Sequence, residues 1–316
     1  MAVLNKQLSI EIVRVTEAAA IAAAKLRGRG DERAADQVAV TAMRTELNNI
    51  AFEGTIVIGE GTQDETDLLF VGEKVGSGSG NVVDVAVDPL EGNTLTAKAR
   101  LNALSVMAVA EGGSLMHVPD CYMEKIAVGG DLPDGVVDLD STPDENLKNL
   151  AEAKGVSVDD LTVCILDRPR NGSLIGKVRD TGAAINLIPD GDIAGVIHAA
   201  NTNNTGIDIY MGSGGAPEGV LAAAALRCIG GQMQGRLILQ STQDRALVAN
   251  MTVDDPYKKF TIDDMASGEV IFAATGVTDG SLLKGVRLGA NVTTTDSLVM
   301  RSASGSVRWI KNQRRT

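Results

Sequence analysis

The sequence predicts an α/β fold from three features. Two amphipathic helical segments occupy the first 50 residues, and short apolar runs that end in charged or glycine-containing turns follow them. From residue 161 to residue 229, β-branched runs alternate regularly with helical segments. Such alternation is typical of a largely parallel sheet with helices on its faces. A chain of 316 residues is long enough for one large α/β domain or for two lobes.

The first helix is expected at residues 5–27. Leu8, Ile12, Val15 and Ala19 recur at spacings of three and four residues, which gives this segment one apolar face. Two glycines that follow shortly afterwards are expected to end the helix.

A second helix is expected to begin after Asp31, a good N-cap residue, and to end near Ile50. Its apolar stripe includes Val40 and Met43, and four residues earlier the same stripe reaches Asp36. A carboxylate on a buried stripe is costly unless it is paired or binds a metal ion. The alternative is that Asp36 lies in the first turn and complements the helix dipole.

Two short strands in the first half are followed directly by carboxylates. Residues 55–58 lead into Glu60, which has a glycine on each side. Residues 83–87 lead into Asp88 and Glu91, and a proline and a glycine are expected to form the turn that ends this strand.

The spacing of Asp88 and Glu91 points to a cation. Two carboxylates three residues apart repel each other, and a bound cation or a shared proton removes that repulsion. A hydroxyl follows at Thr94. Carboxylates and a hydroxyl at a strand end predict a divalent metal ion with bound water, and hence the hydrolysis of an anionic substrate. An ordinary acidic turn is the alternative interpretation.

The chain is expected to form two lobes. Further strands are predicted at residues 104–110 and 122–128. Residues 131–160 are polar and partly helical, and we interpret them as the seam between the lobes. The predicted boundaries are therefore 1–130 for the first lobe and 131–316 for the second.

Three strands of the second lobe are expected at residues 162–166, 185–188 and 207–211, each followed by a turn and a helix. Ligands of open α/β sheets bind outside the carboxyl ends of the strands. All three turns are charged or rich in glycine, which predicts a ligand site at this edge. The glycines of the third turn, within residues 212–215, can offer backbone N–H donors to an anion.

The side chains of these turns suit a phosphorylated sugar. Arg168 and Arg170 can hold a phosphate through bidentate hydrogen bonds. Asp190 and Asp192 can accept hydrogen bonds from sugar hydroxyls, or can cap the helix that follows. Glu218 comes at the start of the third helix, where its carboxylate can turn toward a metal ion.

Composition argues against several classes of protein. The net charge of −12 argues against a nucleic-acid partner, because phosphate backbones bind basic surfaces. The sequence has no apolar run of roughly 18 residues, so no membrane span is expected. The first residues lack the pattern of a secretory signal, and a cytoplasmic location is expected.

Histidine and cysteine provide no metal-binding pattern. The two histidines are interpreted as structural, which argues against a zinc site built on histidine. Cys121, Cys164 and Cys228 are widely spaced and are expected to be reduced residues of the core. Lys125, a basic residue with no assigned role, is expected to lie on the surface.

Taken together, the motifs resemble those of a known family. They are Gly28-Arg29-Gly30-Asp31, Val57-Ile58-Gly59-Glu60-Gly61, Val87-Asp88-Pro89-Leu90-Glu91-Gly92, Pro119-Asp120-Cys121-Tyr122-Met123-Glu124-Lys125, Asp167-Arg168-Pro169-Arg170, Pro189-Asp190-Gly191-Asp192 and Gly214-Gly215-Ala216-Pro217-Glu218-Gly219. The chain resembles the class II fructose-1,6-bisphosphatases of bacteria, within the inositol-phosphatase and sugar-phosphatase superfamily. The resemblance runs nearly from end to end.

The resemblance implies a layered α/β/α/β/α fold with two sheets. It implies an N-terminal metal-binding lobe and a C-terminal sugar-phosphate lobe. The implied activity is hydrolysis of the 1-phosphate of fructose 1,6-bisphosphate in gluconeogenesis, with sedoheptulose 1,7-bisphosphate as a further substrate. The implied cofactor is Mg²⁺ or Mn²⁺, and the implied assembly is a homo-oligomer, either a dimer or a tetramer. The paired arginines favour a second phosphate and count against an inositol monophosphate as substrate.

The resemblance also implies roles for individual residues. The implied metal ligands are Asp36, Glu60, Asp88, Glu91 and Glu218. The implied substrate contacts are Glu91, Gly92, Asn93, Tyr122, Arg168, Pro169, Arg170, Asp190, Gly191, Asp192 and Gly215. The implied catalytic residues are Glu60, Asn93 and Thr94.

Three positions depart from the family pattern. The family has a threonine after Asp-Pro-Leu-Glu-Gly, whose hydroxyl helps to position or deprotonate the attacking water, whereas this chain has Asn93 followed by Thr94. Either the turn lets Thr94 take that place, or the chain is a weakly active or non-catalytic homologue that binds sugar phosphate. In addition, Thr62 replaces an acid and Asn171 replaces a basic residue or histidine.

Overall fold

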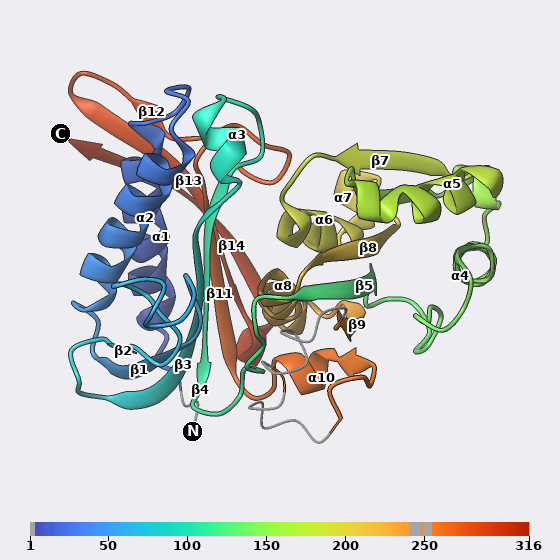
Figure 1. Cartoon of the computed structure of the whole chain (residues 1–316), viewed down its shortest axis with the longest axis horizontal. Helices are drawn as coiled ribbons and strands as arrows, with labels where there is room; N and C mark the ends of the chain where they lie inside the picture. Colours follow the sequence, from blue (N-terminus) through green and yellow to red (C-terminus); the bar gives the residue numbers. More distant parts are fainter. Residues whose placement is uncertain (1–3, 240–247, 249–254, 316) are drawn as a thin grey trace. The chain divides into compact units, whose positions relative to one another are not determined.

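The structure, a computed structural model, describes residues 4–239, 248 and 255–315. The chain divides into two compact units (Figure 1). The first unit comprises Met1–Met116 and Ala266–Thr316, and the second comprises His117–Met265.

This division differs from the predicted boundary at residue 130. Strand β11 (Val270–Gly276) pairs antiparallel with β4 (Leu104–Glu111), so the C-terminal part of the chain belongs to the first sheet. The two strands are separated by the whole second unit, and pairing over that distance leaves no local signal in the sequence.

The described residues of the first unit form an eight-stranded mixed sheet in the order β12-β13-β11-β4-β3-β1-β2, with β14 paired to β13. The remaining strands are β1 Phe52–Ile58, β2 Lys74–Val75, β3 Asn81–Glu91, β12 Arg287–Leu288, β13 Val292–Arg301 and β14 Ser306–Arg315. The helices of this unit are α1 Leu8–Ala24, α2 Glu32–Leu47, α3 Asn93–Ala97 and the 3-10 turn η3 Ser302–Ser304.

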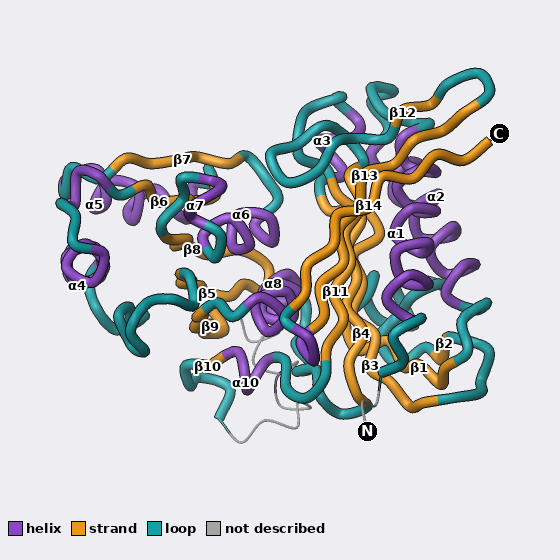
Figure 2. The backbone as a smooth tube through the Cα atoms, turned by 180° about the vertical axis from the view of Figure 1, so that it is seen from behind, coloured by secondary structure: helices purple, strands orange, loops and turns teal. Residues whose placement is uncertain are grey.

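Helices α1 and α2 pack against each other and cover one face of this sheet (Figure 2). Their apolar stripes enter one core: Ile12 and Ala19 from α1 and Met43 from α2 lie with Val85 of β3 and Met107 of β4. Burial of these aliphatic side chains is the main favourable contribution to folding of the unit. The predicted helices and the predicted strand at 83–87 are therefore confirmed.

The described residues of the second unit contain a six-stranded sheet in the order β10-β9-β5-β8-β6-β7. Its strands are β5 Tyr122–Val128, β6 Thr162–Leu166, β7 Ala184–Ile188, β8 Ile209–Gly215, β9 Gln232–Ile238 and β10 Phe260–Thr261. Its helices are α4 Pro143–Lys154, η1 Val158–Asp160, η2 Pro169–Asn171, α5 Gly172–Asp180, α6 Asp192–Ala199, α7 Thr202–Thr205, α8 Ala216–Ile229 and α10 Ile262–Met265.

The second sheet is only partly parallel. Strands β6, β7 and β8 run parallel, as the β–α alternation predicts. Strand β5, however, pairs antiparallel with both β8 and β9, and β9 pairs antiparallel with β10. The prediction of a largely parallel sheet is wrong for this half, because β5 and β9 lie outside the alternating segment and their partners are set by tertiary packing.

Helices cover both faces of the second sheet. Helices α4 and α5 pack on the face that contains Ile126 and Val163, through Leu147 and Ile175. Helices α6 and α8 contact each other and strands β5 and β8. Successive side chains of a strand point to opposite faces, so Lys125 lies on the face opposite to Ile126. Since α4 belongs to this core, residues 131–160 are not a seam between lobes.

Asp31 begins α2 as expected. Its carboxylate accepts a hydrogen bond of 2.9 Å from the backbone N–H of Ala34. This bond satisfies one of the N–H groups that lack a partner in the first turn of a helix. The cap thereby fixes where the helix starts and which face Asp36 occupies.

We expect Asp31→Ala to lower the free energy of unfolding by about 1 kcal/mol, because the N-cap acceptor is lost. Urea unfolding followed by circular dichroism measures this change. Asp31→Asn keeps a side-chain oxygen and is expected to stay within roughly 0.5 kcal/mol of the wild type. Equal losses in the two variants would show that the cap is not the cause.

Candidate functional site

Glu60 and Asp88 leave the same end of two neighbouring strands. Strands β1 and β3 are parallel, and Ile58 is the register partner of Ala86. Glu60 and Asp88 each come two residues after these partners. Parallel neighbours end at the same edge of a sheet, so both carboxylates lie at one edge of the first sheet.

Strand β3 continues past Asp88 through a bulge, which corrects the expected turn at Pro89. Asp88 is the partner of Val106 and Glu91 is the partner of Leu104, so β3 advances three residues while β4 advances two. Proline has no N–H to give to the ladder, and a bulge is the place where a strand tolerates it. The bulge changes the direction of the chain between the two carboxylates, and Glu91 is buried.

Gly92 ends the strand and begins α3. Its φ of 96° lies in the left-handed region that favours glycine, and a Cβ at this position would press against Leu95. The turn places Asn93 and Thr94 in the first helical turn of α3, directly after Glu91.

Asn93 and Thr94 contact two different carboxylates of α2. The side chain of Asn93 hydrogen-bonds Asp36, whereas the Thr94 hydroxyl donates to Glu32 Oε2 at 2.8 Å. Glu32 and Asp36 are four residues apart and therefore share one face of α2. Burial raises the pKa of Asp36, and the hydrogen bond from Asn93 opposes this rise. Asn93, rather than Thr94, is thus directed at a predicted metal ligand.

Glu218 lies in the first turn of α8 in the second unit. Burial raises its pKa, the nearby Asp192 carboxylate raises it further, and Lys125 opposes the rise. Gly215 precedes the helix, and a Cβ there would overlap the Glu218 carboxylate. The glycine is therefore required for Glu218 to turn back over the start of its own helix.

Residues 212–215 belong to strand β8 and do not form the expected turn. They pair with β5, from Gly212 opposite Lys125 to Gly215 opposite Tyr122. Much of their backbone is consequently engaged in the sheet ladder, and a loop of free N–H donors for an anion is not formed. Because these glycines have no side chains, they leave room for neighbouring side chains.

The prediction that Lys125 lies on the surface is wrong. It is 1% exposed, and its Nζ lies 2.5 Å from Asp192 Oδ2 and 2.8 Å from the Gly215 carbonyl oxygen. Asp192, expected to contact sugar hydroxyls or cap a helix, begins α6 and is paired with this lysine. The hydroxyl of Tyr210 lies 3.5 Å from the same carboxylate oxygen.

The two arginines that follow β6 are held in different ways. Arg168 pairs with Asp190 at 3.4 Å, and both side chains are partly exposed. Arg170 donates from Nε to the Ser213 carbonyl oxygen at 2.9 Å, and its guanidinium lies 4.4 Å from the centre of the Tyr122 ring. Burial raises the pKa of Asp190, and Arg168 opposes this rise.

Asn171 bridges two strands that separate beyond their paired residues. Strands β6 and β8 pair only at residues 163–164 and 209–210. Farther along, the Asn171 amide donates to the carbonyl oxygens of Leu166 and Ser213 at 3.1 and 3.2 Å, and accepts from the Ser213 N–H at 2.9 Å. This departure from the family pattern has a structural role here.

A cavity of about 480 Å³ in the second unit adjoins these residues. It is lined in part by Arg170, Lys177 and Ser213. Glu124 also lines it, and burial raises the pKa of this carboxyl. Two basic side chains beside a cavity suit an anionic group of a ligand.

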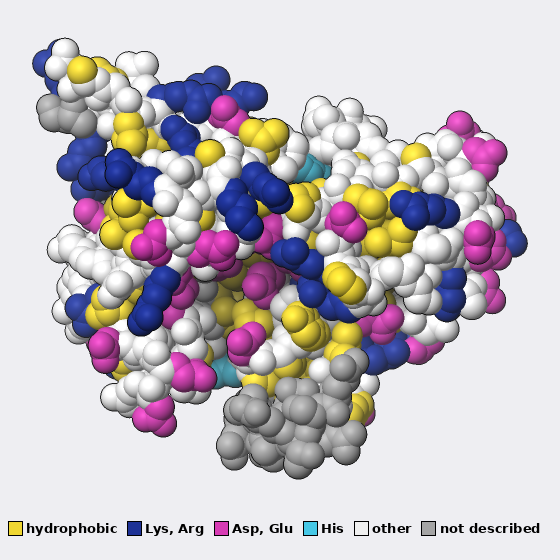
Figure 3. All heavy atoms as spheres, turned by 45° about the horizontal axis from the view of Figure 1, so that its top comes forward, with side chains coloured by type: hydrophobic (Ala, Val, Ile, Leu, Met, Phe, Trp, Pro, Cys, Tyr) yellow, Lys and Arg dark blue, Asp and Glu magenta, His cyan; other side chains and the backbone are white. Residues whose placement is uncertain are grey.

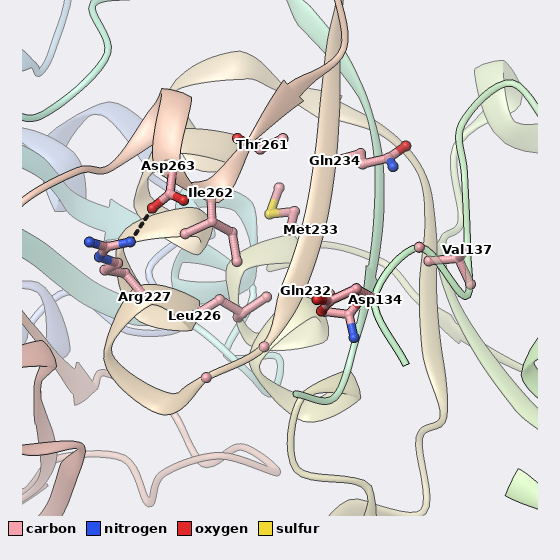
Figure 4. A pocket seen from close by; sticks show the side chains of 13 residues that line it. Asp134, Val137, Leu226, Arg227, Gln232, Met233, Gln234, Thr261, Ile262 and Asp263 are labelled. Carbon is pink, nitrogen blue, oxygen red and sulfur yellow. Dashed lines mark hydrogen bonds and ion pairs between the residues drawn. The ribbon is translucent and has the colours of Figure 1, made fainter. Parts of the chain in front are cut away.

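A second pocket, of about 510 Å³, is lined by none of the predicted site residues (Figure 4). Several of its polar side chains are engaged with the protein itself: Arg227 pairs with Asp263, and Gln232 donates to the Leu132 carbonyl oxygen at 2.8 Å. We assign no ligand to this pocket.

Each unit, taken by itself, contains oxygen donors of the kind that bind hard divalent cations. Glu218 Oε2 and Asn93 Oδ1 are buried and accept no hydrogen bond within the described part of the chain. Carboxylate and amide oxygens suit Mg²⁺ and Mn²⁺ rather than soft metals. In residues 4–239, 248 and 255–315, no group of three or more His, Cys, Asp or Glu side chains is arranged to hold a metal ion, so the ligand set stays a prediction.

Sequence reasoning missed two residues, one in each unit, that contact predicted site residues. Glu32 holds the Thr94 hydroxyl, and nothing in the sequence connects residues so far apart. Lys125 had a detectable signal, since it is a charged residue in an apolar strand and lies opposite a glycine-rich one. The cysteines agree with prediction, because Cys121, Cys164 and Cys228 are buried and form no disulfide with one another.

The surface also bears on the class of protein. Acidic and basic side chains are interspersed over the face drawn in Figure 3. Every helix in the described residues is too short or too polar to span a bilayer. The described residues thus combine two mixed sheets flanked by helices with carboxylates at strand ends and arginines near a cavity.

Comparison with known proteins gives the family. A family model described as bacterial fructose-1,6-bisphosphatase, glpX-encoded, matches residues 6–314. Two proteins named D-fructose 1,6-bisphosphatase class 2/sedoheptulose 1,7-bisphosphatase, from Synechococcus sp. strains JA-3-3Ab and JA-2-3B'a(2-13), are each 43% identical over 332 residues. These alignments cover 97% of this chain and 95% of each relative.

Fructose-1,6-bisphosphatase 1 class 2 of Escherichia coli strain K12 is 42% identical over an alignment 323 residues long. This alignment covers 98% of this chain and 95% of the relative. The chain therefore belongs to the glpX-encoded bacterial fructose-1,6-bisphosphatase family. The resemblance stated from the motifs is confirmed, and so is the two-sheet α/β fold class.

We expect Asn171→Ala to lower the free energy of unfolding by about 2–3 kcal/mol, because it leaves the buried backbone groups of Ser213 and Leu166 without a partner. Urea unfolding measures the change. Asn204→Ala, which removes an exposed hydrogen bond to Asn201, is the control and is expected to cost less than about 0.5 kcal/mol. A loss at Asn171 no larger than that of the control would contradict the bridging role.

Proposed function

We propose that this chain hydrolyses the 1-phosphate of fructose 1,6-bisphosphate to give fructose 6-phosphate and phosphate. Sedoheptulose 1,7-bisphosphate is proposed as a second substrate, because the two Synechococcus relatives carry both names. The geometric observation that supports the proposal best is the position of Glu60 and Asp88 at the ends of adjacent parallel strands, with Glu91 just beyond a bulge. The family match over residues 6–314 supports the same activity.

The proposed metal ligands are Asp36, Glu60, Asp88, Glu91 and Glu218. Mg²⁺ or Mn²⁺ bound there would lower the pKa of a water molecule and offset the charge of the phosphoryl group. In the reaction, the water oxygen forms a bond to phosphorus, the bond from phosphorus to the C1 oxygen breaks, and that oxygen takes a proton. Phosphate monoesters hydrolyse extremely slowly without a catalyst, so alignment and charge stabilisation are the main requirements.

Residues of the chain would hold the substrate and the reacting groups. Arg168 and Arg170 are proposed to bind the phosphate that is not cleaved, since guanidinium groups match phosphate oxygens. Asp190 is proposed to contact a sugar hydroxyl while Arg168 holds its carboxylate. Asn93 is proposed to orient Asp36 through their hydrogen bond.

The remaining proposed contacts follow the same assignment. The substrate contacts are Glu91, Gly92, Tyr122, Pro169, Gly191, Asp192 and Gly215, and Glu60 and Thr94 complete the catalytic group. A role in gluconeogenesis, a cytoplasmic location and a homo-oligomeric state, dimer or tetramer, are proposed with the activity on the basis of family membership.

A metal-dependent activity gives a direct test. Protein treated with EDTA and then desalted is expected to release no phosphate from fructose 1,6-bisphosphate, and added Mn²⁺ or Mg²⁺ is expected to restore release. A malachite green assay measures the phosphate, and fructose 6-phosphate serves as a control substrate that should not be cleaved. If the metal-loaded protein releases no phosphate from either bisphosphate, the proposed function is wrong.

The alternative, a sugar-phosphate-binding homologue impaired by Asn93, is not favoured, because relatives at 42–43% identity are named as bisphosphatases. Thr94 does not occupy the position of Asn93 next to Asp36, because the Thr94 hydroxyl donates to Glu32. The test of this alternative is therefore the effect of restoring the family threonine.

We expect Asn93→Thr to change kcat by less than about tenfold, because the Asn93 side chain already hydrogen-bonds Asp36. Steady-state kinetics with fructose 1,6-bisphosphate measures the change. Thr41→Ala, a substitution on the exposed part of α2, is the control for general effects on this helix. A gain of several powers of ten in kcat would instead show that the wild type is impaired.

A further inference from the structure

Lys125 is a buried charge that the proposed chemistry does not use. It lies in β5, a strand with neighbours on both sides, and its side chain is fully enclosed. A buried ammonium group is strongly unfavourable unless it is paired and hydrogen-bonded. Here it donates to Asp192 Oδ2 at 2.5 Å and to the Gly215 carbonyl oxygen at 2.8 Å.

Nearby glycines leave room for this ammonium group. A Cβ at Gly214 would overlap the Asp192 carboxylate and lie 3.0 Å from Lys125 Nζ. A Cβ at Gly219, in the first part of α8, would press against Met123 Sδ at 2.6 Å and would only make an ordinary contact with Lys125 Cδ at 3.4 Å. The backbone of β8 at Gly214 therefore leaves room for the ion pair of Lys125 with Asp192.

The partners of Lys125 begin two different helices. Asp192 is the first residue of α6, and Gly215 is the residue just before α8. One ammonium group therefore connects the starts of both helices. Because Asp192 Oδ2 is held by Lys125, the direction of the second carboxylate oxygen is fixed as well.

We propose that Lys125 is a positioning residue for sugar binding, which acts by holding the Asp192 carboxylate and the Gly215 backbone in place. This inference rests on the proposed function, in which Asp192 and Gly215 contact the sugar. Lys125 itself need not touch the substrate. A group displaced by about 1 Å can lose about 10²-fold in rate or affinity, so a lost anchor has a measurable effect.

A second lysine of the same unit provides a matched control. Lys154 of α4 pairs with Asp208 at 2.5 Å, and Asp208 also accepts from the Thr162 N–H. Asp208 immediately precedes β8, whereas Gly215 ends it, so this ion pair lies at the opposite end of the strand. It is a structural pair with no part in the proposed sugar site.

The experiment compares Lys125→Met with Lys154→Met. Metal-free protein is titrated with fructose 6-phosphate by calorimetry, and the metal-loaded protein is assayed for kcat and KM with fructose 1,6-bisphosphate. We expect Lys125→Met to raise the Kd for fructose 6-phosphate and the KM by about 10–100-fold, with a smaller change in kcat. Lys154→Met is expected to change both constants by less than about threefold.

A conservative variant separates positioning from simple loss of stability. Lys125→Gln keeps N–H donors for Asp192 and Gly215 and is expected to bind fructose 6-phosphate more tightly than Lys125→Met. If Lys125→Met does not fold, as judged by circular dichroism, the comparison of Lys125→Gln with the wild type carries the test. A folded Lys125→Met that binds fructose 6-phosphate as tightly as the wild type would overturn the inference, and so would a folded Lys125→Gln that binds it no more tightly than Lys125→Met.

The same measurements separate this inference from the proposed function. A wild-type protein that binds fructose 6-phosphate but releases no phosphate from bisphosphates contradicts the proposed activity only. In that case a higher Kd of Lys125→Met for fructose 6-phosphate still supports the positioning role. A wild-type protein that does not bind fructose 6-phosphate overturns the positioning role, because there is then no sugar site to position.

Discussion

The hydrogen-bonded register of strand β3 is the constraint on which the first unit depends. Parallel pairing with β1 brings Glu60 and Asp88 to one sheet edge, and antiparallel pairing with β4 forces the bulge before Glu91. A shift of one residue would turn Val85 and Val87 out of the core. The apolar side chains that stabilise the sheet therefore also fix the directions of its carboxylates.

In the second unit, a buried ion pair and a buried amide, rather than a bulge, fix the positions of neighbouring residues. Lys125 holds Asp192 and Gly215, and Asn171 joins β6 to β8 where their pairing stops. Both groups are buried and their polar atoms are engaged, which makes their geometry well defined. Such anchoring suits the proposed sugar-phosphate site, because loosely held groups lose affinity on ordering.

The local elements were predictable because their signals are local. The periodic stripe through Val40 and Met43 gave α2, and the short β-branched run 162–166 gave β6. The side-chain cap at Asp31 gave a helix start. Acids placed directly after strands identified Glu60 and Asp88, since the edge of a sheet is where ligands are bound in α/β proteins. Nearly the whole candidate set arose from such short patterns and from the family resemblance they support.

The sequence by itself determined the helices, most strands, the acidic strand ends and the family motifs, because these depend on neighbours within a few residues. Only the tertiary structure decided that β11 joins the first sheet, that Lys125 is buried and that Asn93, not Thr94, faces Asp36. Each of these depends on a contact between distant segments. Such contacts are set by the burial of whole faces and by pairing energies that no local pattern records.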